Sequence, residues 1–226
     1  VKAEGFGVYK PNGHFVVVDN NERDPAKLAA TAEIAASSQA IDAPEGYDIP
    51  APEGLSYLPY QRGGIKALEE RHSALLADPM GLGKTIQICG LLNKIPAELR
   101  TVLVVVPASL KINWYKEATR WLVIPRRIDI LNGSGKIEGI DPANIIQSVP
   151  SDPDIVIVNY DVLAKHSKQL TGRIWDCVVF DESHYLKNPS AARTIHCLGG
   201  DKKDQKALKI RARRRYALTG TPVPNR

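Results

Sequence analysis

The sequence has few cysteines and no long hydrophobic run, and both scarcities exclude classes of protein. Cys89, Cys177 and Cys197 form no Cys-x-x-Cys pair and leave one cysteine over in any disulfide scheme. This predicts a reduced intracellular protein whose cysteines are small apolar core residues. No segment approaches the roughly twenty apolar residues of a membrane span, and no charged-then-apolar signal segment opens the chain. The five histidines form no cluster with metal-ligand spacing, so no structural zinc is expected.

The net charge of the chain is small as well. The 30 lysines and arginines stand against 25 aspartates and glutamates, which gives 30 − 25 = +5. That excess permits a polyanionic partner but does not identify one. The 226 residues are enough for one main α/β domain with an appendage. Because the sequence starts with Val1 and not with methionine, we expect a fragment of a longer protein.

The first 54 residues differ in composition from the rest. Two β-prone runs flank Asn12-Gly13, a dipeptide typical of tight hairpin turns. An alanine-rich helix is expected over residues 24–40, and together these elements form a small N-terminal appendage, residues 1–40. Residues 41–54 carry three prolines and two glycines, which predicts a linker or an extended surface segment.

From about residue 55 onward, short apolar runs alternate with amphipathic helical patterns. The runs are rich in β-formers and nearly uninterrupted, as in strands buried on both faces of a parallel sheet. Strands are predicted within 73–78, 101–107, 154–161, 177–183 and 214–222, and helices within 84–95, 109–122 and 160–170. This pattern predicts an α/β fold with a doubly wound parallel sheet and helices on both faces.

A glycine-containing turn, "DPMGLGKT", follows the first of these strands. Backbone N–H groups and the positive end of a helix that begins at Lys84 would converge there, which suits a nucleotide phosphate. Lys84 would reach the β- and γ-phosphates and Thr85 would ligate Mg²⁺. The strict GxxxxGK[ST] pattern has glycine where this chain has Asp78. The alternative is a glycine turn with a solvated lysine at a helix start.

A pair of adjacent carboxylates follows another predicted strand, in "CVVFDESHYLKN". At the carboxyl edge of a parallel sheet Asp181 would hold Mg²⁺, while Glu182 would orient and deprotonate an attacking water. A lone Asp-Glu pair at a strand end is usually just solvated. Combined with the glycine turn, the pair indicates a centre that hydrolyses a nucleoside triphosphate.

Three segments together resemble a known family. "DPMGLGKT", "DESHYLKN" and "LTGTPVPNR" are similar to motifs I, II and III of the Swi/Snf-type family, superfamily-two helicase-like ATPases that translocate on duplex DNA. The resemblance covers residues 55–226 and implies a first RecA-like lobe that binds ATP and Mg²⁺. Within the family the motifs most resemble the annealing-helicase, HepA-related branch and its bacterial or phage relatives. Pro79 departs from the pattern, because the family usually has an acidic residue there.

The resemblance also implies roles for residues around the phosphate turn. The turn residues that would bind the nucleotide, with the lysine and threonine that follow, are Met80, Gly81, Leu82, Gly83, Lys84 and Thr85. In "LPYQRGGIKAL", Gln61 occupies the position that contacts adenine. His184 would help to couple the nucleotide to a partner lobe.

The motif III turn contains Thr219, Gly220 and Thr221, which would sense the γ-phosphate and transmit its loss. Taken alone, this turn would be interpreted as a simple strand ending.

Candidate nucleic-acid contacts lie in two further segments that resemble motifs Ia and Ib. Ser109 and Lys111 in "PASLKINW", and Asn159 and Tyr160 in "VNYD", would grip phosphates without reading bases. Trp114, Trp121 and Tyr115 are interpreted as helix-face packing residues. The basic run 206–216 is either a DNA contact or a solvated approach to a strand.

Family members have a second RecA-like lobe whose arginines stabilise the transferring phosphoryl group, and this chain ends directly after motif III. We therefore expect the fragment to bind ATP and Mg²⁺ but to hydrolyse ATP poorly. Its partners would be duplex or branched DNA and the second lobe, in an intracellular, DNA-associated protein. Two alternatives remain: an RNA-directed helicase lobe of the same superfamily, and a nucleotide-gated protein-interaction module.

Overall fold

The computed structural model describes residues 6–9, 15–18, 42–78, 80–132, 137–199 and 209–220, the first two ranges by their backbone alone. The predicted helix over 24–40, the Asn12-Gly13 turn, Pro79 and Thr221 lie outside these residues.

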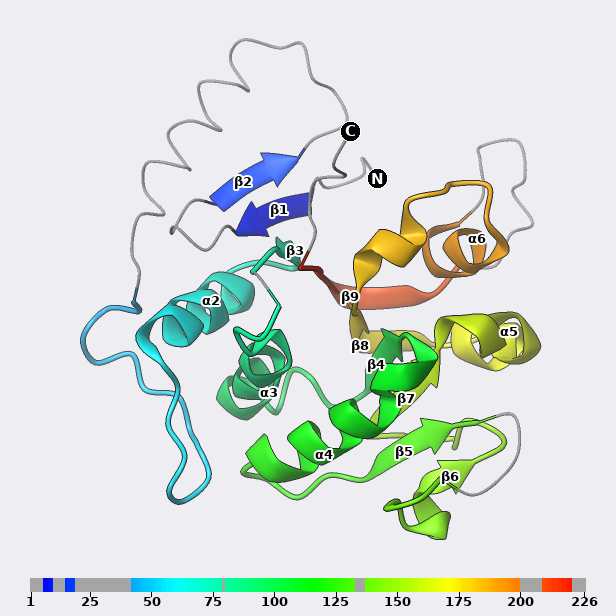
Figure 1. The fold of residues 1–226 in the computed structure, drawn as a ribbon, viewed down its shortest axis with the longest axis horizontal. Helices are drawn as coiled ribbons and strands as arrows, with labels where there is room; N and C mark the ends of the chain where they lie inside the picture. The colour runs from blue at the N-terminus through cyan, green and yellow to red at the C-terminus, as the bar shows by residue number, and fades with distance from the viewer. Residues whose placement is uncertain are drawn as a thin grey trace, which may run out of the picture.

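The described strands form one sheet in the order β2-β1-β3-β9-β8-β4-β7-β5-β6 (Figure 1). Every neighbouring pair from β3 to β6 along this order is parallel, as predicted. The N-terminal hairpin continues this sheet, because β1 pairs with β2 antiparallel and with β3 in parallel. The strands are β1 (Phe6–Tyr9), β2 (Phe15–Val18), β3 (Ser73–Leu76), β4 (Val102–Val106), β5 (Ile128–Leu131), β6 (Ile145–Ile146), β7 (Ile155–Asn159), β8 (Ile174–Phe180) and β9 (Arg211–Leu218).

Helices cover both faces of the sheet (Figure 1). One hydrophobic core joins one face to α2 (Pro59–Glu69), α3 (Lys84–Lys94) and α4 (Lys111–Trp121). A second core joins the other face to α5 (Leu163–Thr171) and α6 (Ala192–Leu198). The central strands β4 and β7 are buried along their whole length, which explains why their sequences are uniformly apolar. Short 3-10 turns lie at Ala108–Leu110, Pro142–Asn144, Tyr160–Val162 and Ser183–Leu186.

The five predicted strands and three predicted helices of the main sheet are all present. Four elements were not predicted from the sequence, namely α2, α6, β5 and β6. The helix α2 contains Gly63 and Gly64, which are poor helix formers, and β6 has only two residues. Cys89, Cys177 and Cys197 are buried, as expected.

The proline-rich segment before α2 is an extended strap packed on the domain. Asn93 of α3 donates hydrogen bonds to the Pro50 carbonyl at 3.2 Å, the Tyr57 hydroxyl at 3.0 Å and the Trp121 carbonyl at 2.7 Å. Its side-chain oxygen accepts the Val123 amide at 3.0 Å. This one buried amide therefore fixes the strap, α3 and the end of α4 to one another.

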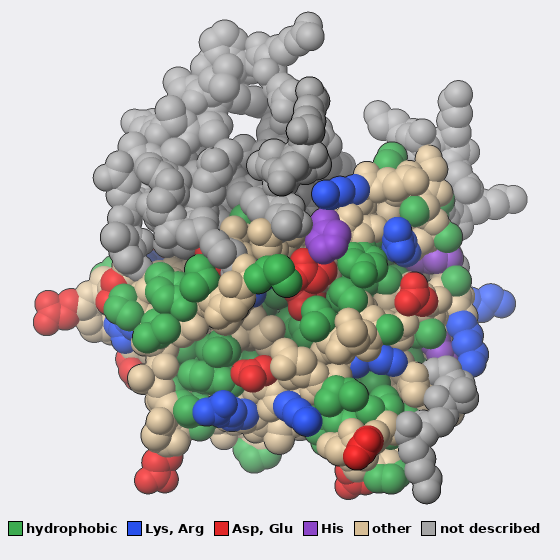
Figure 2. Space-filling model, in the orientation of Figure 1, with side chains coloured by type: hydrophobic (Ala, Val, Ile, Leu, Met, Phe, Trp, Pro, Cys, Tyr) green, Lys and Arg blue, Asp and Glu red, His purple; other side chains and the backbone are tan. Residues whose placement is uncertain are grey.

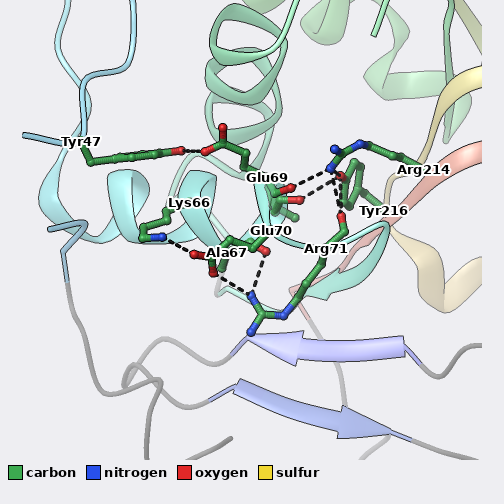
Figure 3. Close-up of polar contacts among 9 residues, drawn as sticks. Tyr47, Lys66, Ala67, Glu69, Glu70, Arg71, Arg214 and Tyr216 are labelled. Atoms are coloured by element: carbon green, nitrogen blue, oxygen red, sulfur yellow. Dashed lines mark hydrogen bonds and ion pairs between the residues drawn. The ribbon is translucent and has the colours of Figure 1, made fainter. Parts of the chain in front are cut away.

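The strand β9 holds the carboxyl end of α2 (Figure 3). The Arg214 guanidinium donates to the Glu69 carbonyl at 2.7 Å and to the Glu98 carboxylate at 2.8 Å. The Tyr216 hydroxyl lies 2.9 Å from the carbonyl oxygens of both Leu68 and Arg71, so its one proton is shared between them. A cation and a hydroxyl thus contact carbonyl groups at the negative end of the helix.

Candidate functional site

The predicted site loops meet at one edge of the sheet. They follow the carboxyl ends of β3, β9, β8, β4 and β7, and these five strands are consecutive neighbours. Since all five are parallel, their carboxyl ends point the same way, and the glycine turn, the threonine turn and the Asp-Glu pair become adjacent.

The glycine turn has a backbone that side chains would disturb. Gly81 and Gly83 adopt positive φ angles of 85° and 73°. A Cβ atom on Gly83 would lie 2.5 Å from the side-chain nitrogen of Gln61. Glycine at position 83 is thus required both by conformation and by space, and α3 begins directly after it without a side-chain cap. The first-turn amides of α3 therefore receive no hydrogen bond from a capping side chain at position 83 and point toward the turn, an arrangement that suits an anion.

Lys84 lies folded over the turn that precedes it. Its side chain is 9% exposed, and its Nζ donates a hydrogen bond to the Asp78 carbonyl oxygen at 2.9 Å. Thr85 is half-buried in the first turn of α3. Both residues therefore occupy the positions that the sequence predicted for a phosphate and Mg²⁺ site.

Asp78 has a role that the sequence did not reveal. Its carboxylate is buried and accepts a hydrogen bond from Gln87 at 2.7 Å. Burial raises the pKa of this carboxyl, while the Gln87 hydrogen bond and the charge of Lys84 oppose that rise. The residue that replaces the first glycine of the strict pattern therefore ties the turn to α3.

Gln61 connects α2 to the glycine turn. Its side-chain oxygen accepts the Leu58 amide at 3.0 Å, and its side-chain nitrogen donates to the Leu82 carbonyl at 3.3 Å. The amide is only 4% exposed. Gln61 thus lies against the turn, and an adenine contact would require it to exchange one of these hydrogen bonds.

The Asp181 carboxylate is held from two sides. One oxygen accepts the Glu182 amide at 2.8 Å, and the other accepts the indole N–H of Trp114 at 2.7 Å. Burial raises the pKa of Asp181, and these two hydrogen bonds and the charge of Lys84 act against it. An oriented carboxylate offers oxygen ligands of the kind that Mg²⁺ prefers.

Glu182 has an unusual backbone. Its φ of 46° makes it the single non-glycine residue with positive φ within the described parts of the chain. Such a conformation costs free energy and is typical of functional positions. The side-chain oxygen of Glu182 lies 3.1 Å from Nδ1 of His184, so the predicted coupling residue contacts the predicted base.

The motif III turn packs directly on the glycine turn. Thr219 is buried, and its amide donates to the Leu76 carbonyl at 3.0 Å. A Cβ on Gly220 would lie 2.7 Å from the Met80 side chain and 3.8 Å from Nζ of Lys84. Gly220 therefore allows the two turns to approach, which a simple strand ending would not require.

The four predicted nucleic-acid contacts differ in accessibility. Ser109 is exposed, and Lys111 is half-buried with its Nζ 3.1 Å from the Asn132 side-chain oxygen. Burial lowers the pKa of Lys111. Asn159 and Tyr160 are 5% and 2% exposed.

The position of Tyr160 differs from the prediction. Its hydroxyl donates to the Asp181 carbonyl at 2.8 Å, and its ring stacks on Tyr185. The ring therefore supports the Asp181 loop and does not face solvent, so a side-chain contact with nucleic acid does not fit this conformation. The same burial applies to the amide of Asn159.

The aromatic residues of α4 pack as interpreted from the sequence, with Trp114 and Trp121 buried and Tyr115 partly buried. In the basic run, Arg213 is exposed and pairs with Asp176 at 3.2 Å, whereas Arg214 is buried in the α2 contact. Figure 2 shows lysine and arginine side chains scattered among acidic and hydrophobic ones on the described part of this face, and not in one stripe. Charge distribution on this face therefore does not mark a DNA track.

The described residues contain no helix that is long and apolar enough for a membrane span. They also contain no group of three or more histidine, cysteine, aspartate or glutamate side chains arranged to hold a metal ion.

Comparisons with known proteins agree with this geometry. The family model described as SNF2-related domain matches residues 35–226. The chain is 38% identical over 176 residues to the SWI/SNF-related matrix-associated actin-dependent regulator of chromatin subfamily A-like protein 1 of Bos taurus, covering 76% of this chain and 16% of that protein. It is 31% identical over 176 residues to the human DNA annealing helicase and endonuclease ZRANB3, covering 75% and 15%. The chain thus spans about a sixth of the length of these relatives.

A solved structure is also similar. The Sulfolobus solfataricus SWI2/SNF2 ATPase core in complex with double-stranded DNA matches with a TM-score of 0.59 and 29% identity. The match covers 79% of this chain and 34% of that one.

Proposed function

Because the chain belongs to the SNF2-related domain family, we propose that it is the first ATP-binding lobe of a DNA-dependent ATPase that couples hydrolysis to translocation on, or remodelling and annealing of, duplex DNA. The observation that carries the proposal is the convergence of Lys84, Asp181 and Gly220 on one glycine turn. The resemblance of the motifs and the similarity to a SWI2/SNF2 ATPase core support the same assignment.

The residues around the turn divide the chemical work. The backbone amides at the start of α3 would hold the phosphates of ATP, and Lys84 would leave the Asp78 carbonyl to neutralise their charge. Thr85 and Asp181 would hold Mg²⁺, which supplies positive charge for phosphoryl transfer when bound. Glu182, held beside His184, would orient a water and take its proton.

Of the four predicted DNA contacts, we propose the two whose side chains are accessible. Ser109 and Lys111 lie at the start of α4, next to the site edge, and both have exposed or half-exposed side chains. They would contact phosphates, which fixes the lobe on DNA without reading sequence. A second RecA-like lobe would complete the ATP site with arginines, and the protein would be DNA-associated in the cell.

The direct test is steady-state ATPase activity of the chain extended through a second lobe. The assay compares no nucleic acid, duplex DNA, forked DNA and RNA, with Glu182→Gln as the control. We expect strong stimulation by DNA and a loss of about 10²-fold or more in the control, because the general base is removed.

Each other outcome favours a different function. Stimulation by RNA above DNA would favour an RNA-directed helicase lobe, and the ratio of forked to duplex DNA tests an annealing activity. Hydrolysis that is absent or indifferent to nucleic acid would overturn the proposal and favour a nucleotide-gated interaction module.

A further inference from the structure

A buried tryptophan contacts the Asp181 carboxylate from a different element. Trp114 lies in the first half of α4, is 2% exposed, and donates its indole N–H to Oδ2 of Asp181 at 2.7 Å. The two residues are 67 positions apart in the chain. This contact is short and charge-assisted, which places it among the stronger hydrogen bonds of proteins.

The contact limits how the carboxylate can rotate. With Oδ1 fixed by the Glu182 amide and Oδ2 fixed by Trp114, the plane of the group is set from both sides. A carboxylate oxygen has two lone pairs, so each oxygen keeps one for another partner. The remaining lone pairs then point in directions that the protein, and not solvent, determines.

The support extends to the backbone of Asp181. Its amide donates to the Val105 carbonyl at 2.8 Å, and its carbonyl accepts the Tyr160 hydroxyl at 2.8 Å. The main chain of Asp181 is therefore fixed without Trp114. Loss of the indole N–H should free the side chain alone.

We propose that Trp114 is a positioning residue for the Mg²⁺ site, which orients the Asp181 carboxylate through its indole N–H. This inference rests on the proposed function, because it takes Asp181 as the residue that holds Mg²⁺. Groups that orient a metal ligand from behind commonly change metal affinity by about 10–100-fold when they are removed.

The same helix supplies a matched control. Trp121 is also buried in α4, but its indole nitrogen has no hydrogen-bond partner within the described structure. Trp114→Phe replaces the indole by a smaller phenyl ring and removes the N–H that bonds Asp181. Trp121→Phe makes the same change in ring size but removes an N–H that has no hydrogen-bond partner in the described structure. Incorporation of benzothienylalanine at position 114 replaces the N–H by sulfur and keeps the ring size.

The experiment is a Mg²⁺ titration of the whole protein with a non-hydrolysable ATP analogue, followed by the shift in thermal unfolding temperature. We expect Trp114→Phe and the benzothienylalanine protein to need at least about tenfold more Mg²⁺ for the half-maximal shift. Nucleotide affinity measured in EDTA should be unchanged in both, and Trp121→Phe should keep the wild-type Mg²⁺ midpoint.

The Mg²⁺ titration distinguishes an error in the role of Trp114 from an error in the proposed function. If the wild-type protein shows no Mg²⁺-dependent nucleotide binding, the assignment of the site itself is wrong. If the wild type responds but the benzothienylalanine protein has the same Mg²⁺ midpoint, Trp114 serves packing alone. An equal shift in Trp121→Phe would likewise assign the effect to packing.

Discussion

Asp78 shows how one residue can change the physical character of a phosphate loop. The buried carboxylate takes a hydrogen bond from Gln87, and the carbonyl of the same residue takes one from Lys84. A glycine at this position would offer only the carbonyl. The loop of this protein is therefore braced against α3 by a group whose protonation depends on its burial.

That burial predicts a pH dependence of stability. Because the pKa of Asp78 is raised in the folded state, the folded protein binds this proton more tightly than the unfolded chain. The contribution of Asp78 to the free energy of unfolding therefore falls as the pH rises from the ordinary value of about 4 through the raised one. Asp78→Asn keeps an oxygen acceptor for Gln87 but removes this titration.

Urea unfolding of both proteins between pH 4 and pH 7 tests this prediction. The stability of Asp78→Asn relative to the wild type should increase with pH. A difference that stays constant would show that folding does not shift this pKa, and one that decreases with pH would show that the carboxylate is stabilised as an anion.

Site residues can be proposed from the sequence where the information is local. Lys84 and Thr85 follow a glycine turn directly, and Asp181 and Glu182 follow an apolar strand, so a short pattern identifies each pair. The contact between Trp114 and Asp181 depends on how β8 and α4 are placed, and no short pattern encodes a pair so far apart. Tyr160 was mispredicted for a related reason, because its burial is set by Tyr185 and the Asp181 loop.

At the scale of elements, α2 and α3 approach each other over glycines. A Cβ on Gly64 would lie 1.9 Å from the Gln87 side-chain oxygen, and one on Gly90 would lie 2.3 Å from Ile65. The glycine pair of α2, Gly63 and Gly64, therefore combines two opposite effects. Gly64 allows the helices to approach closely, while Gly63, which is half-buried, only weakens the helix.

Alanine substitutions separate the two effects. Gly64→Ala should destabilise the protein by about 1–3 kcal/mol, because the new methyl group displaces Gln87 and with it the brace on Asp78. Gly63→Ala should stabilise it by up to about 1 kcal/mol, through helix propensity. Both values come from chemical unfolding, and equal effects of the two substitutions would contradict the close approach.

The two strands missed by sequence analysis share a cause. The strand β6 is two residues long and β5 contains Asp129, so neither gives a clear run of β-formers. Long, uniformly apolar strands such as β4 and β7 were predicted, since burial on both faces leaves a pattern that a single sequence retains. The hairpin was predicted as strands, but its pairing with β3 requires the whole sheet.

At the scale of the molecule, the proposed site is assembled from loops of five neighbouring strands, so we expect it to bind nucleotide without a second lobe. ATP with Mg²⁺ should therefore raise the unfolding temperature of this chain alone. At a ligand concentration of 100 times Kd the stabilisation is about 2.7 kcal/mol, and each kcal/mol raises Tm by about 2–4 °C for a chain of this size.

Differential scanning fluorimetry with and without ATP and Mg²⁺ measures this shift. Lys84→Ala is the control, because it removes the charge that meets the phosphates and should abolish most of the shift. An unchanged wild-type Tm at millimolar ligand would mean that the lobe does not form its site alone.

The position of β9 in the sheet has a consequence for folding during synthesis. It is the last described strand in the chain, yet it lies between β3 and β8. During synthesis the glycine turn after β3 and the Asp-Glu pair after β8 therefore belong to two sheet halves with no strand in common. We expect a nascent chain whose β9 is still inside the ribosome to have an exposed strand edge on each half, and the turns after β3 and β8 to become neighbours only once β9 has been translated.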